Sequence, residues 1–264
     1  MKRWFTRWFA FMVRLCMLAL SLAGSAYATA PVIPVFSGDG SPPKMFVHEG
    51  EQRGVLIDIL NYADKQMPQH RFELSLYPWA RAYMASASGQ GGLLGISWTW
   101  RRDEVFDYSE PLFYDEVVIV VRKGHEFNYQ SLSDLQGKTL GTVRGASFGS
   151  AFDRAHQDGV FSIEGDNSAR NRLSKLAAGR IDCALFNVGR AGFQETLRLH
   201  QIPKSQWKNF VVLPVPLRRD PNYLAFPKTM QMGEWLRGFN EVIRQGYARG
   251  DIQKIIERNL YASQ

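Results

Sequence analysis

The sequence has few cysteines and no clustered metal-ligating residues. Two of its 264 residues are Cys, and Cys16 falls in the leader described below, so Cys183 stands alone and no intrachain disulfide is expected. Cys183 lies in the apolar run 181–186, which predicts a buried, inert thiol. The five His residues are scattered without metal-ligand spacing, so we place each at the surface and expect neither a metal nor a cofactor. No phosphate-binding loop or Gly-x-Ser-x-Gly nucleophile motif is present.

Long apolar runs are also scarce, and the one near the start is short. Residues 15–23 are apolar, basic residues precede them, and a small-x-small site follows at Ala26-Tyr27-Ala28. This order predicts a secretory signal peptide over residues 1–28, cut after Ala28. A membrane anchor is the weaker alternative, because the run falls short of the roughly 20 residues needed to span a bilayer and Arg14 interrupts it.

An excess of positive charge is mostly a property of that leader. The chain has 32 Lys and Arg against 25 Asp and Glu, and four of the basic residues lie in residues 1–28, which leaves 28 against 25, or +3. A balance this small argues against nucleic-acid binding. Hydrophobic content of 45% and charged content of 22% are ordinary for a globular protein of one large domain or two lobes.

The stretch 94–112 carries the strongest chemical signal. An apolar, β-prone run turns polar at Ser97, and Thr99 is a good N-cap for a helix whose first turn contains Arg102. A helix N-terminus attracts anions, and an arginine beside it can grip a carboxylate with two hydrogen bonds. The alternative is a capped surface helix whose arginines are solvated.

This stretch resembles the family 3 periplasmic solute-binding proteins of the amino-acid-binding type. That family reads Ser-x-Thr-x-x-Arg, a short helix, then Phe or Tyr-Ser-x-Pro at this point. The matching residues here are Ser97, Thr99, Arg102, Tyr108, Ser109 and Pro111. Further segments resemble the family in the same order along the mature chain: 54–62, 131–148, 176–186, 223–228 and 250–260.

The resemblance implies a type II periplasmic-binding-protein fold with two α/β lobes. Two hinge strands would join the lobes, and the ligand cleft would lie between them. Lobe 1 would be discontinuous, 29–115 plus 219–264, and lobe 2 would be 116–218. Closing the lobes on a ligand would be a hinge motion. Alternation of strand and helix patterns independently favours an α/β architecture.

The resemblance also implies the ligand-binding residues. Arg102 matches the arginine that grips the ligand carboxylate, with Ser97 and the backbone around Gly95 assisting. Trp79 is the candidate for apolar contact, although a tryptophan at a helix start is a core residue about as often. From lobe 2, Ser147 and Asn187 would reach the ligand. Asn187 stands where amino-acid binders have the acid that meets the ligand ammonium.

The leading hypothesis is a monomeric periplasmic protein that binds a small carboxylated solute, amino-acid-like or an organic acid, for an ABC-type transporter or a sensor. Because Asn187 is neutral, we expect a carboxylate with a hydroxyl, keto or ring substituent. If the ligand were an amino acid, Asp39 or Glu110 would have to meet its ammonium. The rival is an enzyme on the same fold, such as a cyclohexadienyl-type dehydratase, with Glu49, Glu110 or Asp115 as acid or base.

Overall fold

The computed structural model describes residues 30–261, and the predicted signal peptide lies outside them. Its strands are β1 (Val32–Gly38), β2 (Phe46–His48), β3 (Glu51–Arg53), β4 (Arg71–Tyr77), β5 (Gly92–Ile96), β6 (Phe106–Tyr108), β7 (Phe113–Arg122), β8 (Thr139–Val143), β9 (Ser162–Asp166), β10 (Cys183–Asn187), β11 (Phe210–Val212) and β12 (Arg218–Pro227). Its helices are α2 (Val55–Gln66), α3 (Trp79–Ala87), α4 (Trp100–Asp103), α5 (Ser150–Gln157), α6 (Ala169–Ala177), α7 (Gly189–Leu199), α8 (Lys204–Trp207), α9 (Gly233–Ala248) and α10 (Asp251–Tyr261), with 3₁₀ turns η1 (Leu132–Leu135) and η2 (Lys228–Met230). The prediction of an α/β fold is confirmed.

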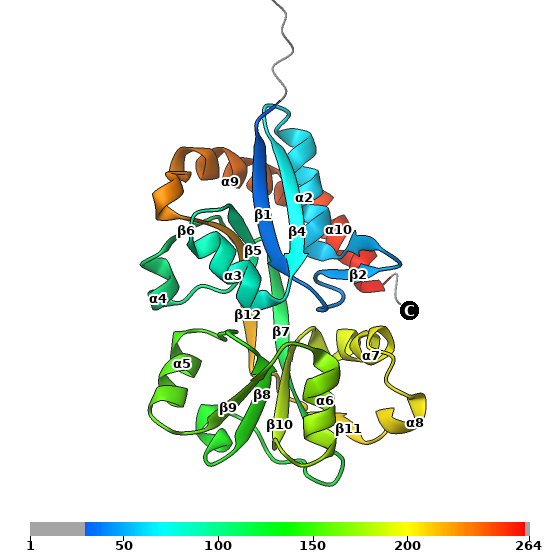
Figure 1. The fold of residues 1–264 in the computed structure, drawn as a ribbon. Coiled ribbons are helices and arrows are strands. Elements are labelled where there is room, and N and C mark those ends of the chain that lie inside the picture. The colour runs from blue at the N-terminus through cyan, green and yellow to red at the C-terminus, as the bar shows by residue number, and fades with distance from the viewer. Residues whose placement is uncertain (1–29, 262–264) are drawn as a thin grey trace, which may run out of the picture. The chain divides into compact units, whose positions relative to one another are not determined.

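The main sheet has two parallel ends and an antiparallel middle (Figure 1). Its order is β4-β1-β5-β12-β7-β10-β8-β9, with β6 beside β12 and β11 beside β7. β1 pairs in parallel with β4 and β5, and β8 pairs in parallel with β9 and β10. Parallel neighbours need crossover connections, and α2, α3, α5 and α6 supply them.

The two ends of the sheet are joined by the long strands β7 and β12. They pair antiparallel with each other, with Phe113 opposite Asn222 and Val117 opposite Arg218. β12 then continues along β5 and β6, and β7 continues along β10 and β11. These two strands are where the hinge was predicted.

The position of β7 in the sheet explains why its sequence is apolar without alternation. Val117, Ile119 and Val121 pack into one buried cluster with Phe148 and Phe152, whereas Val118 and Val120 pack into another with Leu173 and Phe186. Helices cover both faces of this part of the sheet, so both faces of the strand must be apolar. Cys183 pairs beside Val121, is fully buried and has its pKa raised to about 12 by burial, as expected of an inert thiol.

Most predicted elements are found, and the differences have local causes. The segment 250–260, which resembles the family's last helix, lies in α10, and the alternation of Phe72, Leu74 and Leu76 lies on β4. The apolar run that begins at Phe210 forms a strand only as far as Val212, because Pro214 and Pro216 have no N–H for a sheet. The helix after Thr99 is only four residues long. No helix among residues 30–261 is long and apolar enough to cross a membrane.

Candidate functional site

A cavity of about 300 Å³ lies where the two ends of the sheet face each other, and it contains every residue predicted to touch the ligand. The elements around β1, β4 and β5 contribute Trp79, Gly95, Ser97 and Arg102. The elements around β8, β9 and β10 contribute Ser147 and Asn187. The volume suits a molecule of the size of an amino acid. Residues that the sequence singled out from motifs scattered over more than a hundred residues thus line a single cavity.

Arg102 is held firmly in this cavity by α4. Thr99 caps the helix as predicted, accepting a hydrogen bond from the Arg102 N–H at 3.2 Å. The guanidinium donates to the Ser97 carbonyl at 3.0 Å and, across the cavity, to the Gly145 carbonyl at 3.3 Å. Arg102 is 6% exposed, so the alternative of a solvated surface arginine is wrong for Arg102 and right only for its exposed neighbour Arg101.

The charge of Arg102 has no carboxylate partner among residues 30–261. Burial lowers the pKa of its guanidinium, and no acid in this part of the chain forms an ion pair with it. A guanidinium has five N–H donors, of which the two carbonyls use two. A buried cation with donors to spare is the arrangement that an incoming anion would complete.

A second buried arginine of the same cavity is fully paired. Arg172 of α6 is 3% exposed and holds Asp166 of β9 through two hydrogen bonds of 3.2 and 3.0 Å. Its remaining nitrogen donates to the Leu185 carbonyl at 2.8 Å. The sequence analysis did not single out Arg172. The available signal was its spacing, since it shares the buried stripe of α6 with Ala169, Leu173 and Leu176.

The predicted Ser97 hydroxyl is committed to another group. Its Oγ donates to the buried carboxylate of Asp220 on β12, which also pairs with Arg218 at 3.2 Å. Burial, with help from the charge of Asp115, raises the pKa of Asp220, and Ser97, Arg218 and Lys44 offset part of that rise. A ligand therefore meets the Ser97 backbone more readily than its hydroxyl.

Asp220 should make stability depend on pH. A carboxyl whose pKa is higher in the folded than in the unfolded state contributes stability at low pH that is lost as pH rises through that window. Relative to Asp220→Asn, the wild type should therefore lose stability as pH rises from about 4. Urea unfolding of both proteins over a pH series measures the difference. Parallel curves would show that Asp220 does not titrate abnormally.

Ser147 is likewise engaged within its own loop. Its Oγ donates to the Asp153 carboxylate, at 2.8 and 2.7 Å from the two oxygens, and accepts from the Gly149 N–H at 3.2 Å. The loop is fastened to the opposite wall by Trp79, whose Nε1 donates to the Gly145 carbonyl at 3.2 Å. Ser147 lines the cavity as predicted, but its hydroxyl already has partners.

Gly149 leaves room for the Arg218 side chain of β12 to reach this loop. It has a φ of +96°, and a Cβ there would overlap Nη1 of Arg218, which donates to the Phe148 carbonyl. Gly149→Ala should destabilise the protein by about 1–3 kcal/mol through backbone strain and displacement of Arg218. Gly159→Ala is the matched control, since its φ is +75° and nothing lies near its Cβ. Equal losses in urea unfolding would contradict a role for the Arg218 contact.

Asn187 stands at the end of β10 and lines this cavity and a larger one. Gly95, with a φ of +81°, could not carry a side chain because a Cβ would crowd Met45 and Leu56. Of the alternative acids, Asp39 lines the small cavity but is exposed, and Glu49, Glu110 and Asp115 do not line it.

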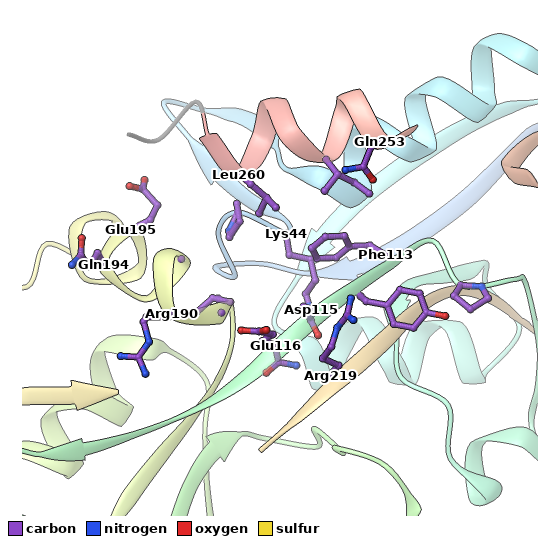
Figure 2. A pocket seen from close by; sticks show the side chains of 18 of the residues that line it. Lys44, Phe113, Asp115, Glu116, Arg190, Gln194, Glu195, Arg219, Gln253 and Leu260 are labelled. Atoms are coloured by element: carbon purple, nitrogen blue, oxygen red, sulfur yellow. The ribbon is translucent and has the colours of Figure 1, made fainter. Parts of the chain in front are cut away.

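The larger cavity, of about 1320 Å³, is shown in Figure 2. α10 with Gln253 and Leu260 forms one side, α7 with Arg190 forms the other, and β7 lies between them. Lys44 lines both cavities, and its ammonium binds Asp115 at 2.6 Å and Asn222 at 3.1 Å. No sequence motif pointed to Lys44, or to His200, a half-buried residue of the small cavity whose pKa is lowered by burial.

Comparison with known proteins identifies the family. The model of the bacterial extracellular solute-binding proteins, family 3, matches residues 33–261. The chain belongs to this family. It is 22% identical over 230 residues to the probable amino-acid-binding protein YxeM of Bacillus subtilis (strain 168), covering 84% of this chain and 81% of that one.

Solved structures agree on the fold. The chain resembles a mutant of ArgBP from T. maritima with a TM-score of 0.70 and 20% identity, over 88% of this chain and 96% of that one. It resembles a histidine kinase sensor domain, described as similar to periplasmic binding proteins, with a TM-score of 0.70 and 21% identity, over 88% and 97%. These matches confirm the predicted type II periplasmic-binding-protein fold.

Proposed function

We propose that this family 3 protein binds a small carboxylated solute, amino-acid-like or an organic acid, in the 300 Å³ cavity and presents it to an ABC-type transporter or a sensor. The observation that carries the proposal is Arg102. It is a buried cation with unused donors, and no carboxylate among residues 30–261 pairs with it. An anionic ligand would supply the missing partner.

Binding would be coupled to closure of two lobes. We assign residues 29–115 and 219–264 to lobe 1 and residues 116–218 to lobe 2, with β7 and β12 as the hinge. Arg102 and Trp79 of lobe 1 both donate to the Gly145 carbonyl of lobe 2, so these bonds form only when the lobes are close. Both walls come from one chain, so a monomer would suffice.

An enzyme on the same fold is the less favoured function. General acid–base catalysis needs a titratable group beside the substrate. Among the described lining residues the single carboxylate is that of Asp39, which is exposed, and Lys44 is paired with Asp115. The half-buried ring of His200 contacts the Gly40 carbonyl, and no carboxylate among the described residues forms an ion pair with it. We therefore expect a bound carboxylate to be recovered chemically unchanged, which mass spectrometry of the released ligand would check.

A thermal-shift screen of the mature protein tests the proposal. At about 100 times its dissociation constant a ligand should stabilise the protein by about 2.7 kcal/mol, which is visible in a melt. Small carboxylic acids and amino acids should supply the hits, and the corresponding amides should fail. Stabilisation by uncharged solutes alone, such as sugars, would refute the assignment of Arg102 as an anion site.

Export to the periplasm is part of the proposal. The basic start, the short apolar run and Ala26-Tyr27-Ala28 predict cleavage after Ala28. Intact mass of the protein recovered from the periplasm should therefore begin at Thr29. A chain that keeps Met1 and sediments with membranes would contradict this and favour an anchor.

A further inference from the structure

The charges of the small cavity narrow the class of ligand. Its ionisable lining side chains are Asp39, Lys44, Tyr77, Arg102, Arg172 and His200. Lys44 is neutralised by Asp115, and Arg172 by Asp166, with both pairs buried. Burial lowers the pKa of the His200 imidazole and so favours its neutral form, although the contact with the Gly40 carbonyl opposes this shift. Within the buried part of the lining, Arg102 leaves one uncompensated positive charge.

No buried carboxylate among the described lining residues remains to receive an ammonium group. Asp39 is exposed, and its Oδ1 already accepts from the N–H groups of Gly40 and Val47 at 2.6 and 3.0 Å. Asn187 offers a neutral amide from the opposite wall. Asp115 and Asp166, which lie behind the lining residues, are paired with Lys44 and Arg172. Once the ligand carboxylate has compensated Arg102, an ammonium enclosed here would be a positive charge without a partner, which is strongly unfavourable.

The rest of the lining suits a ligand whose carbon skeleton is apolar or aromatic. The rings of Tyr77, Trp79 and Phe186 face the same cavity as the aliphatic side chains of Leu76, Val143 and Val188. The hydroxyls of Ser97 and Ser147 are already engaged by Asp220 and Asp153. Ser168 caps α6, and Asn167 is exposed and accepts from Arg144. Among the buried and half-buried lining residues, specific polar contacts are thus offered mainly by Arg102 and Asn187, with the hydroxyl of Ser41 in addition.

We infer that the ligand is a monocarboxylate without an ammonium group, having an apolar or aromatic body and, at most, a neutral hydroxyl or keto group for Asn187. This inference rests on the proposed function, because it assumes that Arg102 receives the carboxylate. Asn187 is then the residue that sets the preference for acids over amino acids, since its amide can donate to an oxygen and cannot neutralise an ammonium.

Isothermal titration with matched probes tests the inference. One series is L-phenylalanine, L-phenyllactate, phenylpyruvate and 3-phenylpropionate. The other is L-leucine and the hydroxy, keto and unsubstituted acids with the leucine carbon skeleton. Within a series only the substituent beside the carboxylate changes. The mature wild type should bind at least one acid without nitrogen about tenfold or more tightly than its amino acid, a difference of about 1.4 kcal/mol.

Asn187→Asp should reverse that order, because the new carboxylate repels the acids and receives an ammonium. Asn209→Asp is the charge-matched control. It lies on the surface outside the cavity lining and should leave the order unchanged.

Tighter binding of the amino acid by the wild type would overturn the inference. If Arg102→Ala also abolished that binding, the proposed carboxylate site would stand while the inference fell. Binding that survives Arg102→Ala, or no binding in either series, would overturn both.

Discussion

Arg102→Ala should weaken binding of the cognate carboxylate by about 2–5 kcal/mol, the usual result of removing one member of a buried charge pair. Three N–H donors and the only unpaired buried charge of the described cavity lining would be lost together. Titration calorimetry on the mature protein measures the loss. The loss of affinity should appear for every carboxylic acid that binds, whatever its carbon skeleton.

The same substitution should leave the fold largely intact. It removes the side-chain donor of the Ser97 carbonyl, whereas the Gly145 carbonyl keeps its bond from Trp79. It also removes a charge that is buried without a partner among residues 30–261, and the two effects oppose each other. Arg101→Ala is the matched control, because Arg101 is exposed and stacks on Trp100 outside the cavity. Unchanged affinity in Arg102→Ala would place the carboxylate elsewhere, and an unfolded variant would make Arg102 structural.

Arg172→Ala should produce the opposite pattern, a loss of stability. Removing it strands the Asp166 carboxylate, which is 4% exposed and has Arg172 as its ion-pair partner. Breaking such a buried pair from one side costs about 3–5 kcal/mol. The free energy of unfolding in urea measures this cost, and two spectroscopic probes should give the same curve if unfolding is two-state.

Two further variants sharpen the experiment. Arg170→Ala removes an exposed charge from the same helix and one bond to the His200 carbonyl, so its cost should stay near 1 kcal/mol. The double change Asp166→Leu with Arg172→Leu removes both charges and should recover much of the lost stability. A fully stable Arg172→Ala would show that Asp166 finds another partner or is protonated.

The sequence predicted the location of the cavity because its motifs are local. Each motif ends a strand or begins a helix, and strand ends of an α/β sheet meet at one edge. Arg102, Trp79 and Asn187 thus come together from α4, α3 and β10. Strand β7 was also visible in the sequence, since its apolar run is continuous.

The partners of those side chains could not be predicted, because they are distant in sequence. Ser97 meets Asp220, which lies 123 residues further along, and Lys44 meets Asp115 after 71 residues. A solvated Arg102 remained an alternative from the sequence, because its neighbours Arg101 and Asp103 are charged residues of the kind found at surfaces. In the structure its guanidinium lies near the rings of Trp79 and Tyr83 and bonds to the Gly145 carbonyl, contacts that are distant in sequence.

A double-mutant cycle between ligand and protein tests the central claim most directly. The best-binding acid and its carboxamide are titrated into wild type and Arg102→Ala, so that each partner loses its charge separately. If Arg102 holds the carboxylate, the amide should bind wild type far more weakly than the acid, while Arg102→Ala should hardly distinguish them. The coupling should then exceed about 1.5 kcal/mol, as for close charge pairs. Equal discrimination by both proteins would show that another group binds the carboxylate.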